Sequence, residues 1–128
     1  MVSYILILKL DENKTIEVGS LGKIDFKEGY YLYVGSAKSS MKRIERHFKT
    51  DKKLRWHIDY LSVNSKVLNA IVFTNAQECD LANTLSQRLE KIKNFGCSDC
   101  KCESHLFYLA KEPYELLKKL FKDVSFYK

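Results

Sequence analysis

YYLYVGSAKSSMKRIERHF, residues 30–48, contains the change of sequence pattern that decides the fold. Its first six residues are aromatic or apolar and end at Gly35, which predicts a buried β-strand over residues 30–35. Small polar residues then lead into a segment with apolar side chains at helical spacing, which predicts a helix over residues 40–49. Two of the four arginines of the chain lie in this helix, so its role in the protein needs an explanation.

The sides of the predicted helix differ in chemistry. Met41, Ile44 and Phe48 fall on one side and are expected to face the core. Arg43 and His47 are four residues apart, so they lie together on another side. This second side is either a solvated basic surface or an anion site. A helix that begins behind small residues presents backbone N–H groups to a phosphate, and a nearby arginine can hold the phosphate by paired hydrogen bonds.

The rest of the chain supplies further strands and helices. Residues 3–10 are apolar on both faces, which predicts a central strand. Other strands are expected at 15–19, 23–26, 67–74 and 105–110, and helices at 54–62, 76–92 and 113–121. This order predicts an α/β fold of the α+β kind, with a small, mainly antiparallel central sheet flanked by helices. The length fits a single domain over residues 1–128.

The composition, 45% hydrophobic and 30% charged, is that of a soluble globular protein and excludes the fibrous and disordered classes. No apolar run is long enough to cross a bilayer, and residues 3–10 are too short and too soon charged for a secretion signal. We therefore expect a cytoplasmic protein that does not associate with membranes.

The net charge of +6 is concentrated in one segment. Residues 38–55 contain eight basic and two acidic residues, whereas the rest of the chain carries equal numbers of each sign. A localised basic stripe is typical of a protein that binds the phosphate backbone of nucleic acid. A solvated lysine-rich surface is the alternative.

The spacing of several residues in this region resembles a known family. Tyr33-Val34-Gly35, with Arg43 eight positions after the glycine and His47 four further on, resembles the second half of the motif that defines the GIY-YIG nuclease superfamily. Residues 55–61, RWHIDYL, and 95–108, FGCSDCKCESHLFY, are similar to signature blocks of a largely archaeal branch of that superfamily with no assigned function. The resemblance covers nearly the whole chain.

The chain departs from the family pattern in its first half-motif. Where the family has Gly-Ile-Tyr, the matching place is Val2-Ser3-Tyr4, so only the tyrosine is kept. The long separation between Tyr4 and Tyr33 implies an inserted hairpin. The late asparagine that some members use is not identified in this sequence.

The resemblance implies a metal-dependent endonuclease that hydrolyses phosphodiester bonds. DNA is expected as the substrate in preference to RNA, with structured or branched DNA as one possibility, and DNA repair is the expected process. The catalytic residues that it implies are Tyr4, Tyr33, Arg43 and His47, and it implies Glu78 as the ligand of a Mg²⁺ ion. Residues expected to contact nucleic acid are Gly35, Ser36, Lys38, Lys42, Arg46, Arg55 and His57. A small domain of this kind often works with a separate targeting partner.

Some of these residues have structural interpretations too. Glu78 lies on the same side of the predicted helix 76–92 as its apolar stripe, and Asn75-x-x-Glu78 also fits a capping box. His57 either hydrogen-bonds within the core or lines the phosphate groove. Asp59 is expected to pair with a nearby base.

Cys97, Cys100, Cys102 and His105 lie within nine residues. Thiolates beside an imidazole suit a structural Zn²⁺ ion, although ligands from one short loop form a strained tetrahedron. Cys79 or His57 is therefore an alternative ligand. Reduced thiols or a disulfide remain the other interpretations.

Two further functions are compatible with these features. A binding module that keeps the superfamily fold without turnover would explain the altered first half-motif. A small zinc-stabilised interaction domain would explain the cysteines alone.

Overall fold

The computed structural model describes residues 2–38, 41–97, 100–121 and 124–127, with Lys38 described by its backbone only. Its main element is a six-stranded sheet of order β6-β7-β4-β1-β5-β8, in which every neighbouring pair is antiparallel. The strands of this sheet are β1 (Val2–Leu10), β4 (Gly29–Lys38), β5 (Lys66–Phe73), β6 (Glu90–Lys91), β7 (Leu106–Leu109) and β8 (Ser125–Tyr127). Strands β2 (Lys14–Glu17) and β3 (Lys23–Phe26) form a separate hairpin, joined by the 3₁₀ turn Gly19–Leu21.

Strand β1 lies at the centre of the sheet, between β4 and β5. Its side chains alternate between two buried clusters, with Tyr4 and Leu6 in one and Ile5 and Ile7 in the other. A strand that is apolar on both faces fits only where both faces of the sheet are covered. The central position predicted for residues 3–10 is therefore confirmed.

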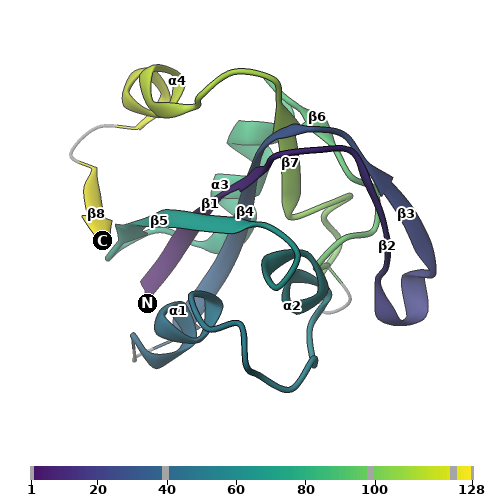
Figure 1. Ribbon diagram of the computed structural model, residues 1–128. Coiled ribbons are helices and arrows are strands. Elements are labelled where there is room, and N and C mark those ends of the chain that lie inside the picture. Colours follow the sequence, from purple (N-terminus) through teal and green to yellow (C-terminus); the bar gives the residue numbers. More distant parts are fainter. Residues whose placement is uncertain (1, 39–40, 98–99, 122–123, 128) are drawn as a thin grey trace.

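Helices cover the two faces of the sheet (Figure 1). The four that the structure describes are α1 (Lys42–His47), α2 (His57–Ser62), α3 (Glu78–Ser86) and α4 (Tyr114–Leu120). Helices α1 and α2 contribute to the cluster that contains Tyr4, and α3 and α4 to the cluster that contains Ile5. This arrangement confirms the predicted α+β class, with an antiparallel central sheet flanked by helices.

Two segments differ from the prediction. The helix expected over residues 76–92 ends at Ser86, and β6 forms at Glu90–Lys91 because these residues pair with β7 at the edge of the sheet. Strand β8 was not expected, and it completes the opposite edge by pairing with β5. In both places the chain satisfies backbone hydrogen bonds with a neighbouring strand, which a local sequence pattern does not report.

The strand directions bring several chain segments to one end of the sheet. Ser3 near the start of β1 pairs with Ser36 near the end of β4 and with Phe73 at the end of β5. Leu106, at the start of β7, pairs with Tyr33. Helix α1 therefore begins where β1 begins, and the chain enters α3 and leaves the cysteine loop at the same end.

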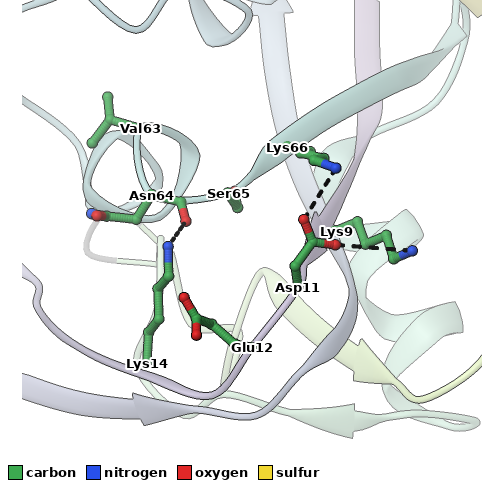
Figure 2. A pocket seen from close by; sticks show the side chains of 8 residues that line it. All are labelled: Lys9, Asp11, Glu12, Lys14, Val63, Asn64, Ser65 and Lys66. Atoms are coloured by element: carbon green, nitrogen blue, oxygen red, sulfur yellow. Dashed lines mark hydrogen bonds and ion pairs between the residues drawn. The ribbon is translucent and has the colours of Figure 1, made fainter.

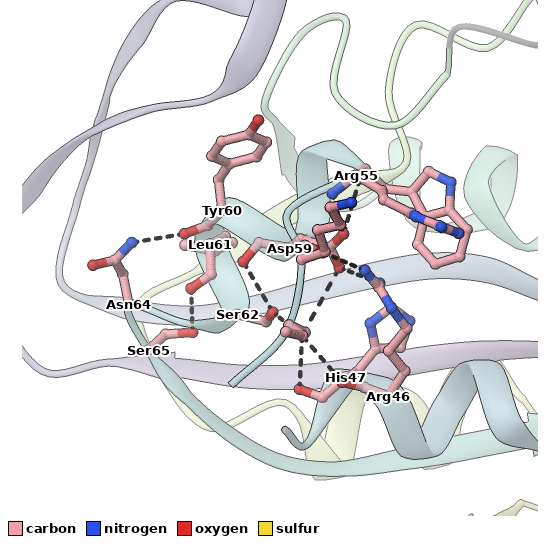
Figure 3. Close-up of polar contacts among 12 residues, drawn as sticks. Arg46, His47, Arg55, Asp59, Tyr60, Leu61, Ser62, Asn64 and Ser65 are labelled. Carbon is pink, nitrogen blue, oxygen red and sulfur yellow. Dashed lines mark hydrogen bonds and ion pairs between the residues drawn. The ribbon is translucent and has the colours of Figure 1, made fainter. Parts of the chain in front are cut away.

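Helices α1 and α2 are joined by a buried carboxylate (Figure 3). Asp59 on α2 is fully buried, and its Oδ1 accepts a hydrogen bond from Arg46 Nη1 at 2.7 Å. Its Oδ2 accepts two backbone N–H groups at the start of α2, at 2.8 and 2.9 Å. Lys52 Nζ lies 3.8 Å from Asp59 Oδ1 and donates to Ser62 Oγ at 2.7 Å. The prediction that Asp59 pairs with a base is confirmed, and these bonds hold the pKa of Asp59 below its ordinary value despite burial.

Asp59→Asn is expected to lower the free energy of unfolding by about 3 kcal/mol, because it leaves the buried Lys52 side chain and the partly buried Arg46 side chain without their counter-charge. Urea denaturation followed by circular dichroism measures this change. Asp51→Asn is the matched control, since Asp51 is an exposed acid of the same segment and its neutralisation should change stability by less than about 0.5 kcal/mol. Equal changes in the free energy of unfolding for the two substitutions would contradict the stabilising role of Asp59.

Candidate functional site

The site begins with the packing of Tyr4 on Gly35. The two residues are paired across β1 and β4, and Tyr4 is only 1% exposed. A Cβ atom at Gly35 would lie 2.5 Å from both Cζ and Oη of Tyr4. Only glycine leaves room for the ring at this position, so the glycine of the Tyr-Val-Gly segment is explained by the tyrosine on the neighbouring strand.

His47 on α1 faces this tyrosine. The Oη of Tyr4 and the Nε2 of His47 are 2.6 Å apart, and His47 is 1% exposed. Burial, and then the charge of Lys52, lower the pKa of His47 from 6.5 to about 3. The ring is therefore neutral at neutral pH, and His47 does not lie on a wet basic surface of α1. Its Nδ1 is buried, with no hydrogen-bond partner among the residues described.

Tyr33 completes an aromatic group with Tyr4 and His47. Its ring centroid lies 6.4 Å from that of Tyr4 and 6.0 Å from that of His47. Burial, followed by the negative charge of Glu78, raises the pKa of Tyr33 well above 10. Burial also raises the pKa of Tyr4, with a smaller contribution from Tyr33. Both phenols are therefore protonated at neutral pH.

Arg43 is held in place at the edge of this group. Its Nη1 donates to the backbone carbonyl of Ser36 at 2.8 Å, and its guanidinium carbon lies 4.7 Å from the centroid of the Trp56 ring. The positive charge of Arg43 acts against the rise in the pKa of both Tyr4 and Tyr33. Trp56 was not predicted as part of the site, although its position directly after Arg55 in the RWHIDYL block was a usable signal.

Glu78 is the first residue of α3 and approaches the site from the far face of the sheet. The N-cap of α3 is Gln77 and not Asn75, so Glu78 is the first helical residue instead of the third, and the capping-box interpretation of Asn75-x-x-Glu78 is wrong. The carboxylate is partly exposed, and its charge raises the pKa of both tyrosines. A partly exposed carboxylate fits Mg²⁺, which binds one or two carboxylates and keeps several waters.

Four ligand atoms gather beside Glu78. The Sγ atoms of Cys79, Cys100 and Cys102 and a ring nitrogen of His105 lie within 4.8 Å of one another, and such a group could hold a metal ion. The expected ligand set is corrected at one position, because Cys79 on α3 takes the place predicted for Cys97. Ligands from two segments avoid the strain that a single short loop would impose.

Of the remaining residues predicted to contact nucleic acid, some are exposed and others are bonded within the protein. Lys42 and Arg55 are exposed, whereas the guanidinium of Arg46 bonds to Asp59 and also lies 4.7 Å from the centroid of the Trp56 ring. His57 Nδ1 accepts the N–H of Gly96 at 2.9 Å, a bond that holds the start of the cysteine loop and favours the structural interpretation of His57. The side chain of Lys38 lies outside the described part of the chain.

A separate polar cavity of about 320 Å³ lies at the other end of β1 (Figure 2). Asp11 lies between Lys9 and Lys66, at 4.0 and 3.1 Å, and Lys14 Nζ donates to the backbone carbonyl of Asn64 at 2.9 Å. These charges are paired with one another or with the backbone, and the cavity is remote from Tyr4, so it is not part of the candidate site.

A family model described as a domain of unknown function, DUF123, matches residues 3–126, so the chain belongs to this family. No curated protein and no solved structure matched the chain with significance. Within the described residues, none of the helices is long and apolar enough to span a membrane.

Stability should depend on pH through His47. The unfolded chain binds a proton at this residue below about pH 6.5, whereas the folded chain does not until the pH approaches about 3. His47 therefore favours unfolding as the pH falls from 6.5 towards 3, by about 2 kcal/mol at pH 5. Urea unfolding at pH 7.5 and 5.0 should show a pH-dependent loss about 2 kcal/mol larger for the wild type than for His47→Gln. Equal losses in the two proteins would show that His47 is charged in the fold or is not buried.

Proposed function

We propose that the protein is a metal-dependent endonuclease of the GIY-YIG superfamily that hydrolyses phosphodiester bonds in DNA. One observation supports this proposal above all others. Tyr4, Tyr33 and His47 contact one another, and the charges of Arg43 and Glu78 act on both tyrosines, so side chains from β1, β4, α1 and α3 influence one another at one end of the sheet. Side chains of this chemistry, brought together from four elements, suit a reaction at a phosphate better than they suit a purely structural role.

In this proposal, Arg43 holds the scissile phosphate. Its guanidinium is pre-positioned by the Ser36 carbonyl and the Trp56 ring, so little side-chain freedom is lost when the phosphate binds. A fixed positive charge of this kind stabilises the extra negative charge that develops on the phosphate oxygens in the transition state. The exposed bases Lys42, Lys49, Lys53 and Arg55 attract the nucleic-acid backbone without reading its sequence.

Tyr4 and His47 act on the attacking water. The phenol gives its proton to His47 Nε2 while it takes one from the water, along the 2.6 Å contact between the two side chains. The low pKa of His47 opposes this transfer in the free protein. A bound phosphate brings negative charge next to the ring and raises that pKa. Tyr33 orients the water.

Glu78 is the residue that would hold Mg²⁺. When bound, the ion supplies positive charge at the leaving oxygen of the scissile phosphate. The partial exposure of the carboxylate leaves room for the water ligands that Mg²⁺ retains.

The nuclease proposal is tested on plasmid, single-stranded, flapped and branched DNA with Mg²⁺ or Mn²⁺. Wild-type protein is expected to cleave at least one of these, and Arg43→Ala and Glu78→Gln are each expected to reduce kcat by about 100-fold or more. Lys118→Ala and Asp80→Asn are the control variants. They remove an exposed base outside the basic stripe and an exposed acid in the same helical turn as Glu78, and each should leave kcat within a few-fold of wild type.

A non-catalytic nucleic-acid-binding module is the second candidate. The raised pKa values of both tyrosines and the Val2-Ser3-Tyr4 departure favour it, because neither phenol is activated in the free protein. Trp56 is the only tryptophan and faces Arg43, so its fluorescence reports binding at this site. Binding by wild type with no cleavage under any metal, unchanged by Arg43→Ala and Glu78→Gln, would establish this module and exclude the nuclease.

We also propose that the metal of the cysteine-histidine group is Zn²⁺, because three thiolates and one imidazole form a typical structural zinc set. Protein purified without chelators is expected to contain about one zinc per chain by elemental analysis. Cys79→Ser should lose the metal, whereas Cys97→Ser, which changes a thiol outside the group, should retain it. Less than about a tenth of an equivalent in wild type would exclude a zinc site.

A further inference from the structure

The metal group and the proposed Mg²⁺ ligand are adjacent in sequence and in space. Cys79 directly follows Glu78 in the first turn of α3, and the other three ligands belong to residues 100–105. A metal bound by all four would tie the start of α3 to the segment that leads into β7. The backbone that carries Glu78 would then be fixed by the ligand next to it.

His105 connects the two places through its ring. Its Nε2 lies 3.4 Å from Cys100 Sγ, on the side of the thiols, and its Nδ1 lies 3.9 Å from Glu78 Oε2. A histidine that binds a metal through one ring nitrogen usually donates the N–H of its other nitrogen to a carboxylate or carbonyl. The carboxylate that faces Nδ1 here is the one that we assign to Mg²⁺.

The backbone of His105 is fixed on both sides. Its N–H donates to the carbonyl of Phe95 at 2.9 Å, and its carbonyl accepts the N–H of Val34 at 2.9 Å. Val34 is the middle residue of the Tyr-Val-Gly segment. The backbone of His105 is therefore held relative to β4, the strand that carries Tyr33 and Gly35, and its ring lies 3.9 Å from the Glu78 carboxylate.

We propose that the zinc centre of Cys79, Cys100, Cys102 and His105 positions the Glu78 carboxylate and thereby sets the affinity of the neighbouring oxygen site for Mg²⁺. His105 is the positioning residue. Zinc bound at Nε2 would place the proton on Nδ1, and a closure of about 1 Å from the 3.9 Å separation would let that N–H donate to Glu78 Oε2. The inference rests on the proposed role of Glu78, and it does not require that the protein cleave DNA.

His105→Cys is the discriminating variant, because it preserves four zinc ligands but removes the imidazole that faces Glu78. Mn²⁺ serves as the probe, with affinity measured by electron paramagnetic resonance on zinc-loaded protein and Glu78→Gln used to identify the site. We expect His105→Cys to retain zinc and to bind Mn²⁺ about tenfold more weakly than wild type. Cys102→Ser should lose zinc and weaken Mn²⁺ by at least as much, and Cys97→Ser should match wild type in both.

Three results would overturn the inference. The first is that zinc-loaded His105→Cys binds Mn²⁺ as tightly as the wild type does. The second is that Cys102→Ser, folded but without zinc, also binds Mn²⁺ as tightly as the wild type. The third is that Glu78→Gln leaves Mn²⁺ binding unchanged. If His105→Cys does not retain zinc or Cys102→Ser does not fold, wild-type protein is stripped with a chelator at low temperature. Mn²⁺ affinity is then compared before and after zinc is restored, and no difference overturns the inference. If Mn²⁺ binding depends on Glu78 and on zinc but no DNA is cleaved, the nuclease proposal is contradicted and this inference stands.

Discussion

The packing of Tyr4 against the bare backbone of Gly35 is the contact on which the site depends. It occurs between the two central strands, where a side chain at residue 35 would collide with the ring. The hydroxyl end of the ring lies over Gly35, and from there it reaches His47 on the helix that follows β4. The same contact leaves Tyr33 beside Tyr4 on one face of the sheet. The absence of a side chain at Gly35 therefore lets Tyr4 of β1 pack on β4 and contact His47 of α1.

Two groups of interactions lie around this contact. One is an ion pair with its hydrogen bonds, and the other is a candidate metal site. On one side, the buried carboxylate of Asp59 ties α1 to α2 through its bond to Arg46. On the other side, the group of Cys79, Cys100, Cys102 and His105 lies between α3 and β7. In the first group, the charge of Asp59 is balanced by basic side chains of the protein. The second group consists of three thiols and one imidazole that could hold a metal ion. Arg43 lies over the ring of Trp56.

The sequence predicts the fold well where periodicity is strong, as in the central strand and the helix after Gly35. It fails at residues 90–91 and 125–127, because short edge strands depend on a partner strand rather than on their own composition. The candidate site residues come from a resemblance to a known motif, and their roles stay a prediction. The sequence assigns Arg43 and Arg46 to different roles, but it does not predict that Arg46 bonds to the buried Asp59, because that partner lies on another helix.

What the sequence alone determined is the set of chemical groups and the local elements that carry them: a strand ending in glycine, a basic helix, and a run of thiols with a histidine. Those patterns depend on neighbours within one or two turns, and a sequence records them directly. Only the tertiary structure decided that Cys79 replaces Cys97 in the metal group and that His105, a member of this group, also faces Glu78. The reason is topological. Antiparallel pairing brings the start of β1, the ends of β4 and β5 and the start of β7 to one end of the sheet, and residues far apart in the chain become neighbours there.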